Sequence, residues 1–118
     1  MTALAHVATG LVALLHLYFL VLEMFLWTTP FGMRTFGLTP EFAKASRALA
    51  ANQGLYNGFL AAGLVWSLLL GAAGHATAIF FLSCVVAAGL FGGFTANRKI
   101  VFVQALPGAV ALALVFLA

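Results

Sequence analysis

Four long apolar runs dominate this chain and leave little sequence between them. They cover about residues 3–27, 48–71, 76–96 and 100–117. Of the 118 residues, 65% are hydrophobic and only 6% are charged, which excludes an ordinary water-soluble globule. Each run approaches or exceeds the roughly 20 residues that a helix needs to cross a bilayer. The sequence therefore predicts an all-α fold, a single domain over residues 1–118 that forms a four-helix transmembrane bundle.

The segment between the first two runs is expected to lie outside the bilayer. Thr28-Thr29-Pro30 ends the first run, and the glycines that follow indicate a loop. Thr39-Pro40-Glu41 is a typical helix start, with threonine as the N-cap, proline at the first position and an acid in the first turn. We therefore expect a short amphipathic helix here, with Lys44 and Arg47 on its polar side, which leads into the second crossing.

The basic residues predict the orientation of the bundle. Four crossings put the segments 28–47 and 97–99 on one face, and both termini on the other. Under the positive-inside rule the basic face is cytoplasmic, so both termini are expected on the non-cytoplasmic side. The N-terminus lacks the features of a cleaved signal peptide, so the first run is expected to persist in the mature protein. The basic face holds all five basic residues: Arg34, Lys44, Arg47, Arg98 and Lys99.

The start of the second run combines polar and small residues, and we take the rest of the chain to be organised around it. At about 100° per residue, a polar arc covers one side of this helix, and small residues form a ridge in another direction. Small residues at this spacing let a neighbouring helix approach closely in a membrane, whereas intramembrane amides need partners. The arc contains Asn52, Gln53, Tyr56 and Asn57, and the ridge contains Gly54, Gly58 and Ala62.

Polar side chains from all four runs fall at one expected depth, near the cytoplasmic ends. Glu23 lies one turn inside the first run, and Gln104 lies just over a turn into the fourth. Thr95 and Asn97 close the third run on the same side. Together with the polar arc, these positions predict one polar cavity that opens toward the cytoplasm.

Glu23 is the only acid inside a predicted crossing, where a carboxylate is costly unless it is paired, hydrated or protonated. His16 and Trp27 share its stripe on the helix, with His16 about 10 Å away in depth. Three roles remain open for Glu23. It locks the bundle by accepting hydrogen bonds from Gln53, Asn57 or Gln104, or by pairing with an interfacial arginine. Alternatively, it binds a ligand as acid, base or anchor, or it couples proton movement. The first role is the most common one for such a residue.

The remaining motifs exclude several classes of site. Cys84 sits in an apolar run, as a small buried hydrophobe does. His6 and His75 fall short of a zinc ligand set, so no metal is expected. The chain has no phosphate-binding loop and no serine-nucleophile motif, and no cofactor is expected. Five basic residues define topology and give no indication of nucleic acid as a partner.

Three sequence stretches together resemble a family of small bacterial four-helix membrane proteins classified only as a domain of unknown function. They are H-L-Y-F-L-V-L-E-M-F-L-W in the first run, N-Q-G-L-Y-N-G-F-L-A-A-G-L in the second, and G-G-F-T-A-N-R-K with V-Q-A-L-P-G near the end. The resemblance covers the whole chain and implies a bacterial inner membrane location without implying an activity. The residues of this chain that fall at the characteristic positions of that family are His16, Glu23, Trp27, Asn52, Gln53, Tyr56, Asn57, Gln104 and Pro107.

Arg47-Ala48 followed by Asn52-x-x-x-Tyr56 also resembles the second-helix signature of the membrane-associated proteins in eicosanoid and glutathione metabolism. That resemblance covers about a quarter of the chain and implies a trimeric four-helix enzyme that binds glutathione between subunits. The chain departs from the family pattern at Leu55, where an acid is expected, and at Phe94, where a tyrosine is expected. The spacing from Arg47 to Asn52 is also one residue longer.

Three functions follow from these observations. The first is a membrane protein whose pocket binds a small amphiphilic or lipid-like ligand, either for binding alone or as a membrane enzyme. The second is a proton-coupled exporter of small molecules, and the third is a structural or accessory membrane subunit. Membrane lipids and further copies of the chain, as a dimer or trimer, are the expected partners. The expected ligand-binding residues are His16, Glu23, Trp27, Asn52, Gln53, Tyr56, Asn57 and Gln104.

Overall fold

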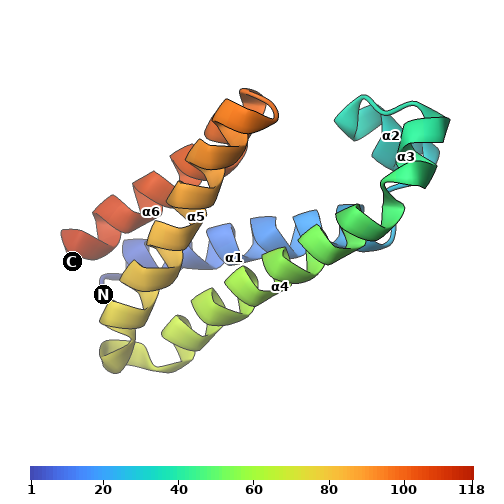
Figure 1. Ribbon diagram of the computed structural model, residues 1–118. Coiled ribbons are helices and arrows are strands. Elements are labelled where there is room, and N and C mark those ends of the chain that lie inside the picture. Colours follow the sequence, from blue (N-terminus) through green and yellow to red (C-terminus); the bar gives the residue numbers. More distant parts are fainter. The chain divides into compact units, whose positions relative to one another are not determined.

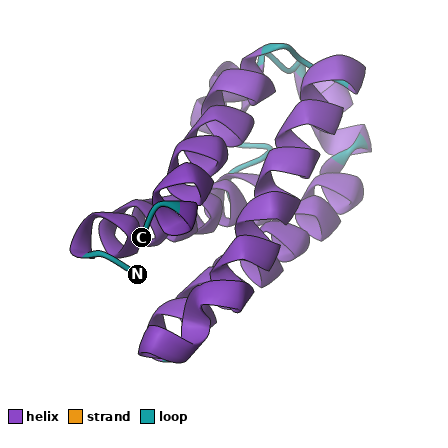
Figure 2. Cartoon of the chain, turned by 90° about the vertical axis from the view of Figure 1, so that its left-hand side faces the viewer, coloured by secondary structure: helices purple, strands orange, loops and turns teal.

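The computed structural model describes residues 1–118 and contains helices joined by short loops (Figures 1 and 2). The fold is all-α, with about four main helices. The contacts divide the chain into two units. Unit 1 comprises Met1–Leu14 and Leu60–Ala118, and unit 2 comprises Leu15–Phe59. Two long helices, α1 (Ala3–Met24) and α4 (Arg47–Leu69), contribute residues to both units.

Two segments are long and apolar enough to cross a membrane, by length and composition. They are α1 and the continuous segment Gly71–Thr95, which joins the short 3₁₀ helix η1 (Gly71–Gly74) to α5 (His75–Thr95). The segment Val101–Phe116 is a shorter apolar helix. The helix α4 is 23 residues long but opens with the polar arc, which lowers its apolar character.

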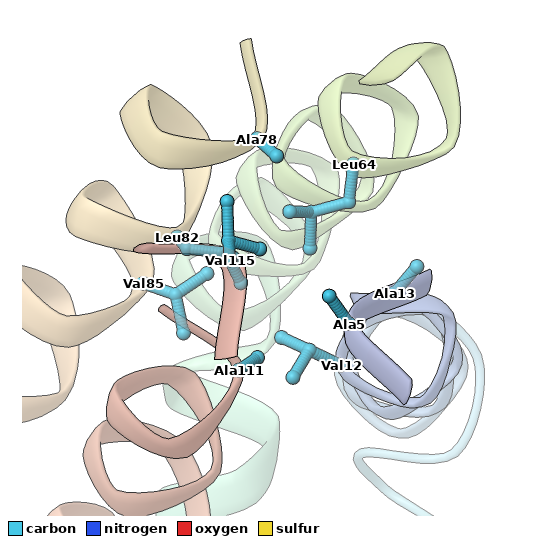
Figure 3. Packing of buried hydrophobic residues seen from close by; sticks show 9 residues of the cluster. All are labelled: Ala5, Val12, Ala13, Leu64, Ala78, Leu82, Val85, Ala111 and Val115. Carbon is cyan, nitrogen blue, oxygen red and sulfur yellow. The ribbon is translucent and has the colours of Figure 1, made fainter. Parts of the chain in front are cut away.

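In unit 1, α5 packs alongside α6 (Leu106–Phe116), and the two run in opposite directions (Figure 1). Both chain ends lie at the same end of this unit (Figures 1 and 2). Its core is made of alanine, valine and leucine side chains from α1, α4, α5 and α6 (Figure 3). The cluster consists of Ala5, Val12, Ala13, Leu64, Ala78, Leu82, Val85, Ala111 and Val115. The small residues among them let the helix backbones approach closely.

A tight contact of helix backbones in unit 1 involves Gly89 of α5 and Ala105. A Cβ atom at Gly89 would lie 2.5 Å from the Ala105 nitrogen and 2.8 Å from the Ala105 Cα. Real Cβ atoms do not approach backbone that closely, so only glycine fits at this position. The contact holds the start of the last helical segment against α5.

The last helical segment, predicted from about residue 100, begins at Val101, and its first turn departs from a regular α-helix. Residues Val101–Ala105 form a π-helical turn, η2, in which the Leu106 N–H donates to the Val101 carbonyl. Pro107 follows directly and has no N–H, so the regular ladder of hydrogen bonds is interrupted here. Wide π turns occur at such interruptions, often near functional sites.

In unit 2, α1 ends at Met24 and not at Trp27 as predicted. The N–H groups of Phe25 and Leu26 both donate to the Val21 carbonyl, at 3.0 and 3.2 Å, which widens the last turn. Thr29 then donates to the Leu26 carbonyl through its N–H at 3.1 Å and its hydroxyl at 2.6 Å. The chain therefore turns away from the helix axis before Trp27.

The helix start predicted at Thr39 is confirmed by α3 (Pro40–Ala45), with the Thr39 hydroxyl accepting from the Phe42 N–H at 3.2 Å. This helix is shorter than predicted, because Arg47, expected on the same helix as Lys44, is the first residue of α4. The prediction of a loop before α3 is wrong, because Pro30–Phe36 forms a further helix, α2. It begins in the same way, with the Thr29 hydroxyl accepting from the Gly32 N–H at 3.2 Å. It ends at Gly37, whose φ of 67° is readily adopted only by glycine.

Candidate functional site

The polar centre of unit 2 is a hydrogen bond between α1 and α4. The Asn57 side-chain amide donates to Glu23 Oε1 at 2.5 Å. Asn57 is buried and Glu23 is half-buried. A carboxyl group and an amide on neighbouring apolar helices satisfy part of each other's hydrogen-bonding capacity, and both retain further donor or acceptor positions. The pair can therefore bind the polar end of another molecule, or exchange a proton with it.

Glycines on α4 bring the two helices together at this pair. A Cβ atom at Gly54 would lie 2.6 Å from Met24 Cγ, 3.1 Å from Glu23 Cβ and 3.2 Å from the Leu20 carbonyl oxygen. One turn further, a Cβ atom at Gly58 would lie 2.7 Å from Leu20 Cδ1. Gly54 and Gly58 of the predicted ridge thus face α1, and Glu23 lies directly beside Gly54, whereas Ala62, the third residue of that ridge, is exposed.

Three residues of the polar arc point elsewhere. Asn52 donates from its amide to the Tyr56 hydroxyl at 3.2 Å, and both side chains are exposed. The Tyr56 ring lies near Phe59, with ring centroids 6.1 Å apart. Gln53 is also exposed. The arc therefore divides into an inward residue, Asn57, and an outward set that leaves α4 free to contact something outside unit 2.

Trp27 lies against the two short helices of unit 2. Its indole N–H donates to the Ser46 hydroxyl at 3.0 Å, and that hydroxyl donates to the Phe42 carbonyl at 2.6 Å. The Trp27 and Phe36 rings are tilted against each other with centroids 4.8 Å apart. Trp27 therefore joins α2 and α3 to the end of α1.

The two remaining predicted site residues are placed separately. His16 is fully buried and meets Phe19 edge-on, with ring centroids 5.2 Å apart. Gln104 belongs to unit 1, where it is half-buried in the π-helical turn η2. Of the eight ligand-binding residues predicted from the sequence, unit 2 joins Glu23 to Asn57 and Asn52 to Tyr56. A common cavity for all eight remains a prediction.

Unit 1 also contains an apolar hollow, of about 230 Å³, between α5 and the η2–α6 segment. Every residue around it is apolar, so it provides space for a hydrocarbon group and no chemistry. It is lined by Val86, Leu90, Val101, Phe102, Ala105, Leu106 and Ala109. No three His, Cys, Asp or Glu side chains come together anywhere in the chain.

Comparison with known proteins places the chain in a family. The model of DUF1304, described as a protein of unknown function, matches residues 10–116. This chain is a member of DUF1304. It is also 32% identical to the uncharacterized protein YpaA of Lactococcus lactis subsp. lactis (strain IL1403) over 106 residues, which cover 88% of this chain and 89% of the relative. No solved structure is significantly similar to the chain.

Sequence reasoning missed one polar contact in this DUF1304 protein. Ser46 accepts the Trp27 indole N–H and follows the last residue of α3, 19 residues further along the chain. The sequence signal was a polar residue at the junction of two predicted helices, beside Arg47. That signal marks a helix end but does not identify its partner, because the partner depends on how α2 and α3 fold back.

Proposed function

We propose that this chain is a multi-pass protein of the bacterial inner membrane that binds a small amphiphilic or lipid-like ligand. Support for membrane insertion comes from α1 and Gly71–Thr95, which have the length and composition of crossings. In this proposal α4 and Val101–Phe116 supply the other two. The segments 28–47 and 97–99, with all five basic residues, then face the cytoplasm, and both termini lie on the other side.

The observation that carries the ligand proposal is the Glu23–Asn57 hydrogen bond. A carboxyl group within an apolar segment is costly, and besides joining helices such residues bind ligands or line proton paths. Glu23 is held by Asn57 and is half-buried, and in this proposal the rest of its carboxyl group binds the ligand. Glu23 then acts as the anchor for the ligand's polar head, or as acid or base if the protein is an enzyme.

The polar residues around this pair support an amphiphile as the ligand. Asn52, Gln53 and Tyr56 are exposed on α4 within about one and a half turns of Asn57, and they offer amide and hydroxyl groups to a polar head. The large apolar side chain of Phe59 is exposed further along the same helix, and it suits a hydrocarbon tail. A ligand with a polar head and a hydrocarbon tail therefore matches the polar and apolar side chains that follow one another along α4.

The test is native mass spectrometry of the protein extracted gently with its lipids. We expect a discrete co-purified small molecule on the wild-type protein and a defined dimer or trimer. Glu23→Gln removes the carboxylate while keeping the side-chain size, and should reduce the retained molecule by at least about tenfold, as expected for loss of a charged hydrogen bond. The mass of the released molecule would identify its chemical class.

Glu41→Gln is the matched control, because it makes the same change at the chain's other acid, which is exposed on α3. This variant should retain the molecule as the wild type does. Equal retention in the Glu23→Gln variant, or a wild-type spectrum without any bound molecule, contradicts the ligand proposal. Circular dichroism of each variant establishes that it has kept its helices.

A structural subunit is the second candidate, and the glycine contacts favour it. Gly54 and Gly58 pack so closely on α1 that the Glu23–Asn57 bond also serves to fix the register of the two helices. In that case the wild-type protein carries no discrete molecule, and Glu23→Gln lowers stability or changes the oligomer. The same spectra therefore separate the two candidates.

A further inference from the structure

The segment Trp27–Arg47 forms a fixed structure that we call the α2–α3 hook. The Trp27 indole N–H donates a hydrogen bond to Ser46, and its ring lies tilted against the ring of Phe36. Gly32 packs directly on the Leu26 carbonyl, in a space that no Cβ atom could occupy. Capping threonines start both helices of the hook. These contacts hold the two short helices of the hook against Trp27 and Leu26.

The hook exposes three phenylalanine rings on its outer surface, which is unfavourable in water. Phe31 is 45% exposed and Phe42 is 57% exposed, one on each short helix. Phe36 is 39% exposed beside them, although it also contacts Trp27. Exposed apolar area carries a free-energy cost of about 25 cal/mol per Å² in water. Phenylalanines on short helices are typical of segments that lie in the boundary between lipid headgroups and acyl chains.

Basic side chains accompany these rings. Arg34 lies one helical turn after Phe31 on α2, so the two share one side of that helix. Lys44 and Arg47 are exposed beyond Phe42, and Glu41 is the single acid of the hook. Long basic side chains can extend from an apolar surface to reach phosphate groups above it. The hook therefore combines ring insertion with a positive charge excess.

We infer that the α2–α3 hook binds the headgroups of anionic phospholipids at the cytoplasmic leaflet. The inference rests on the proposed membrane placement and adds a specific lipid partner to it. Its basis is charge complementarity: three basic groups against one acid, in a segment that also exposes phenylalanine rings. Anionic headgroups attract a basic residue near the surface by about 1 kcal/mol, which corresponds to about fivefold in local lipid concentration. Zwitterionic headgroups offer the same apolar boundary without this attraction.

Trp27 provides the probe for the test because it packs inside the hook. The chain has a second tryptophan, Trp66, and the Trp66→Phe variant leaves Trp27 as the only one. The full chain is reconstituted in vesicles of equal parts phosphatidylcholine and phosphatidylglycerol, with brominated acyl chains on one lipid or the other. Brominated phosphatidylglycerol should quench Trp27 more strongly than brominated phosphatidylcholine, and high salt should weaken this preference.

Two double variants, made in the Trp66→Phe background, locate the effect. R34Q/K44Q removes two charges from the hook, and R98Q/K99Q removes two charges from the other basic turn. The first should abolish the lipid preference, and the second should leave it unchanged. Equal quenching by both lipids before any charge is removed overturns the inference. Equal loss in the two double variants overturns its assignment to the hook.

A different result would contradict the proposed membrane placement. If the chain does not cross the bilayer, alkaline carbonate extracts it from membranes and neither brominated lipid quenches Trp27. That result overturns the proposed function together with the hook. Quenching by both lipids to the same extent leaves the membrane placement intact and overturns the lipid preference alone.

Discussion

Unit 1 and unit 2 both hold helices at very short distances, but they use different chemistry at their contacts. Unit 1 joins α5 to the last helical segment through Gly89 and Ala105, over a core of aliphatic side chains (Figure 3). Unit 2 places a carboxyl–amide hydrogen bond, Glu23 to Asn57, beside its glycine contacts, and adds an indole–hydroxyl bond at Trp27.

The difference shows which part of the molecule is built for packing alone. Aliphatic contacts are non-directional, so they stabilise a bundle without recognising anything. Polar pairs inside apolar segments are costly to assemble and they fix direction and register. Unit 2 carries them next to exposed polar groups on α4, and this is why we propose the ligand site there.

The largest effect is expected from Gly89→Ala in unit 1. The new methyl group would meet the backbone of Ala105, which cannot move aside as a flexible side chain can. We expect the free energy of unfolding to fall by about 3 kcal/mol, measured by loss of helical ellipticity during SDS titration of the detergent-solubilised protein. Gly10→Ala is the control, because its Cβ would meet only Leu68 Cδ1 at an ordinary 3.8 Å. Equal stabilities of the two variants would contradict the backbone contact.

A smaller loss is expected when the polar pair of unit 2 is broken. Asn57→Ala leaves the half-buried Glu23 carboxyl group without its amide partner, and should lower stability by about 2 kcal/mol. In the double variant with Glu23→Ala, the combined loss should fall short of the sum by about 1 kcal/mol. Asn52→Ala is the control and should change stability by less than about 0.5 kcal/mol, because Asn52 is exposed. Simple additivity would show that the pair is not coupled.

The smallest expected effect is a gain in stability, from Thr9→Val in unit 1. Thr9 of unit 1 is fully buried, and its hydroxyl has no hydrogen-bond partner. Thr9→Val keeps the shape and removes the unsatisfied group, so the free energy of unfolding should rise by about 1 kcal/mol. The same SDS titration measures it, with Ser67→Ala for comparison, since Ser67 donates to the Leu64 carbonyl and should not gain. Destabilisation by Thr9→Val would mean that the hydroxyl has a role in unit 1.

Local features of the fold were predictable from the sequence because their causes are local. The apolar runs predicted the main helices, and Thr39-Pro40 predicted the start of α3. The same reasoning applied to Thr29-Pro30 would have found α2, which was missed because the glycines after it were interpreted as a loop. The π-helical turn was missed because Pro107 signals an interruption but does not determine how the chain accommodates it.

The candidate site was predictable as a set of residues but not as an arrangement. Glu23 and Asn57 were each selected by the cost of a polar group in an apolar segment. That cost did not identify Asn57, among several amides, as the partner of Glu23. It also did not separate Asn57 from the outward Asn52 and Tyr56, since the side of α4 that faces α1 is set by the packing of Gly54 and Gly58.

By itself, the sequence determined the helical character of the chain, its apolar segments, its helix caps and its basic segments. Each of these depends on residues within a few positions of one another, where hydrogen bonding and hydropathy act directly. Only the tertiary structure decided that Glu23 meets Asn57, 34 residues away, and that Trp27 meets Ser46. Such contacts depend on the rotation and spacing of whole helices, and these follow from the sum of many packing contacts, which no local pattern contains.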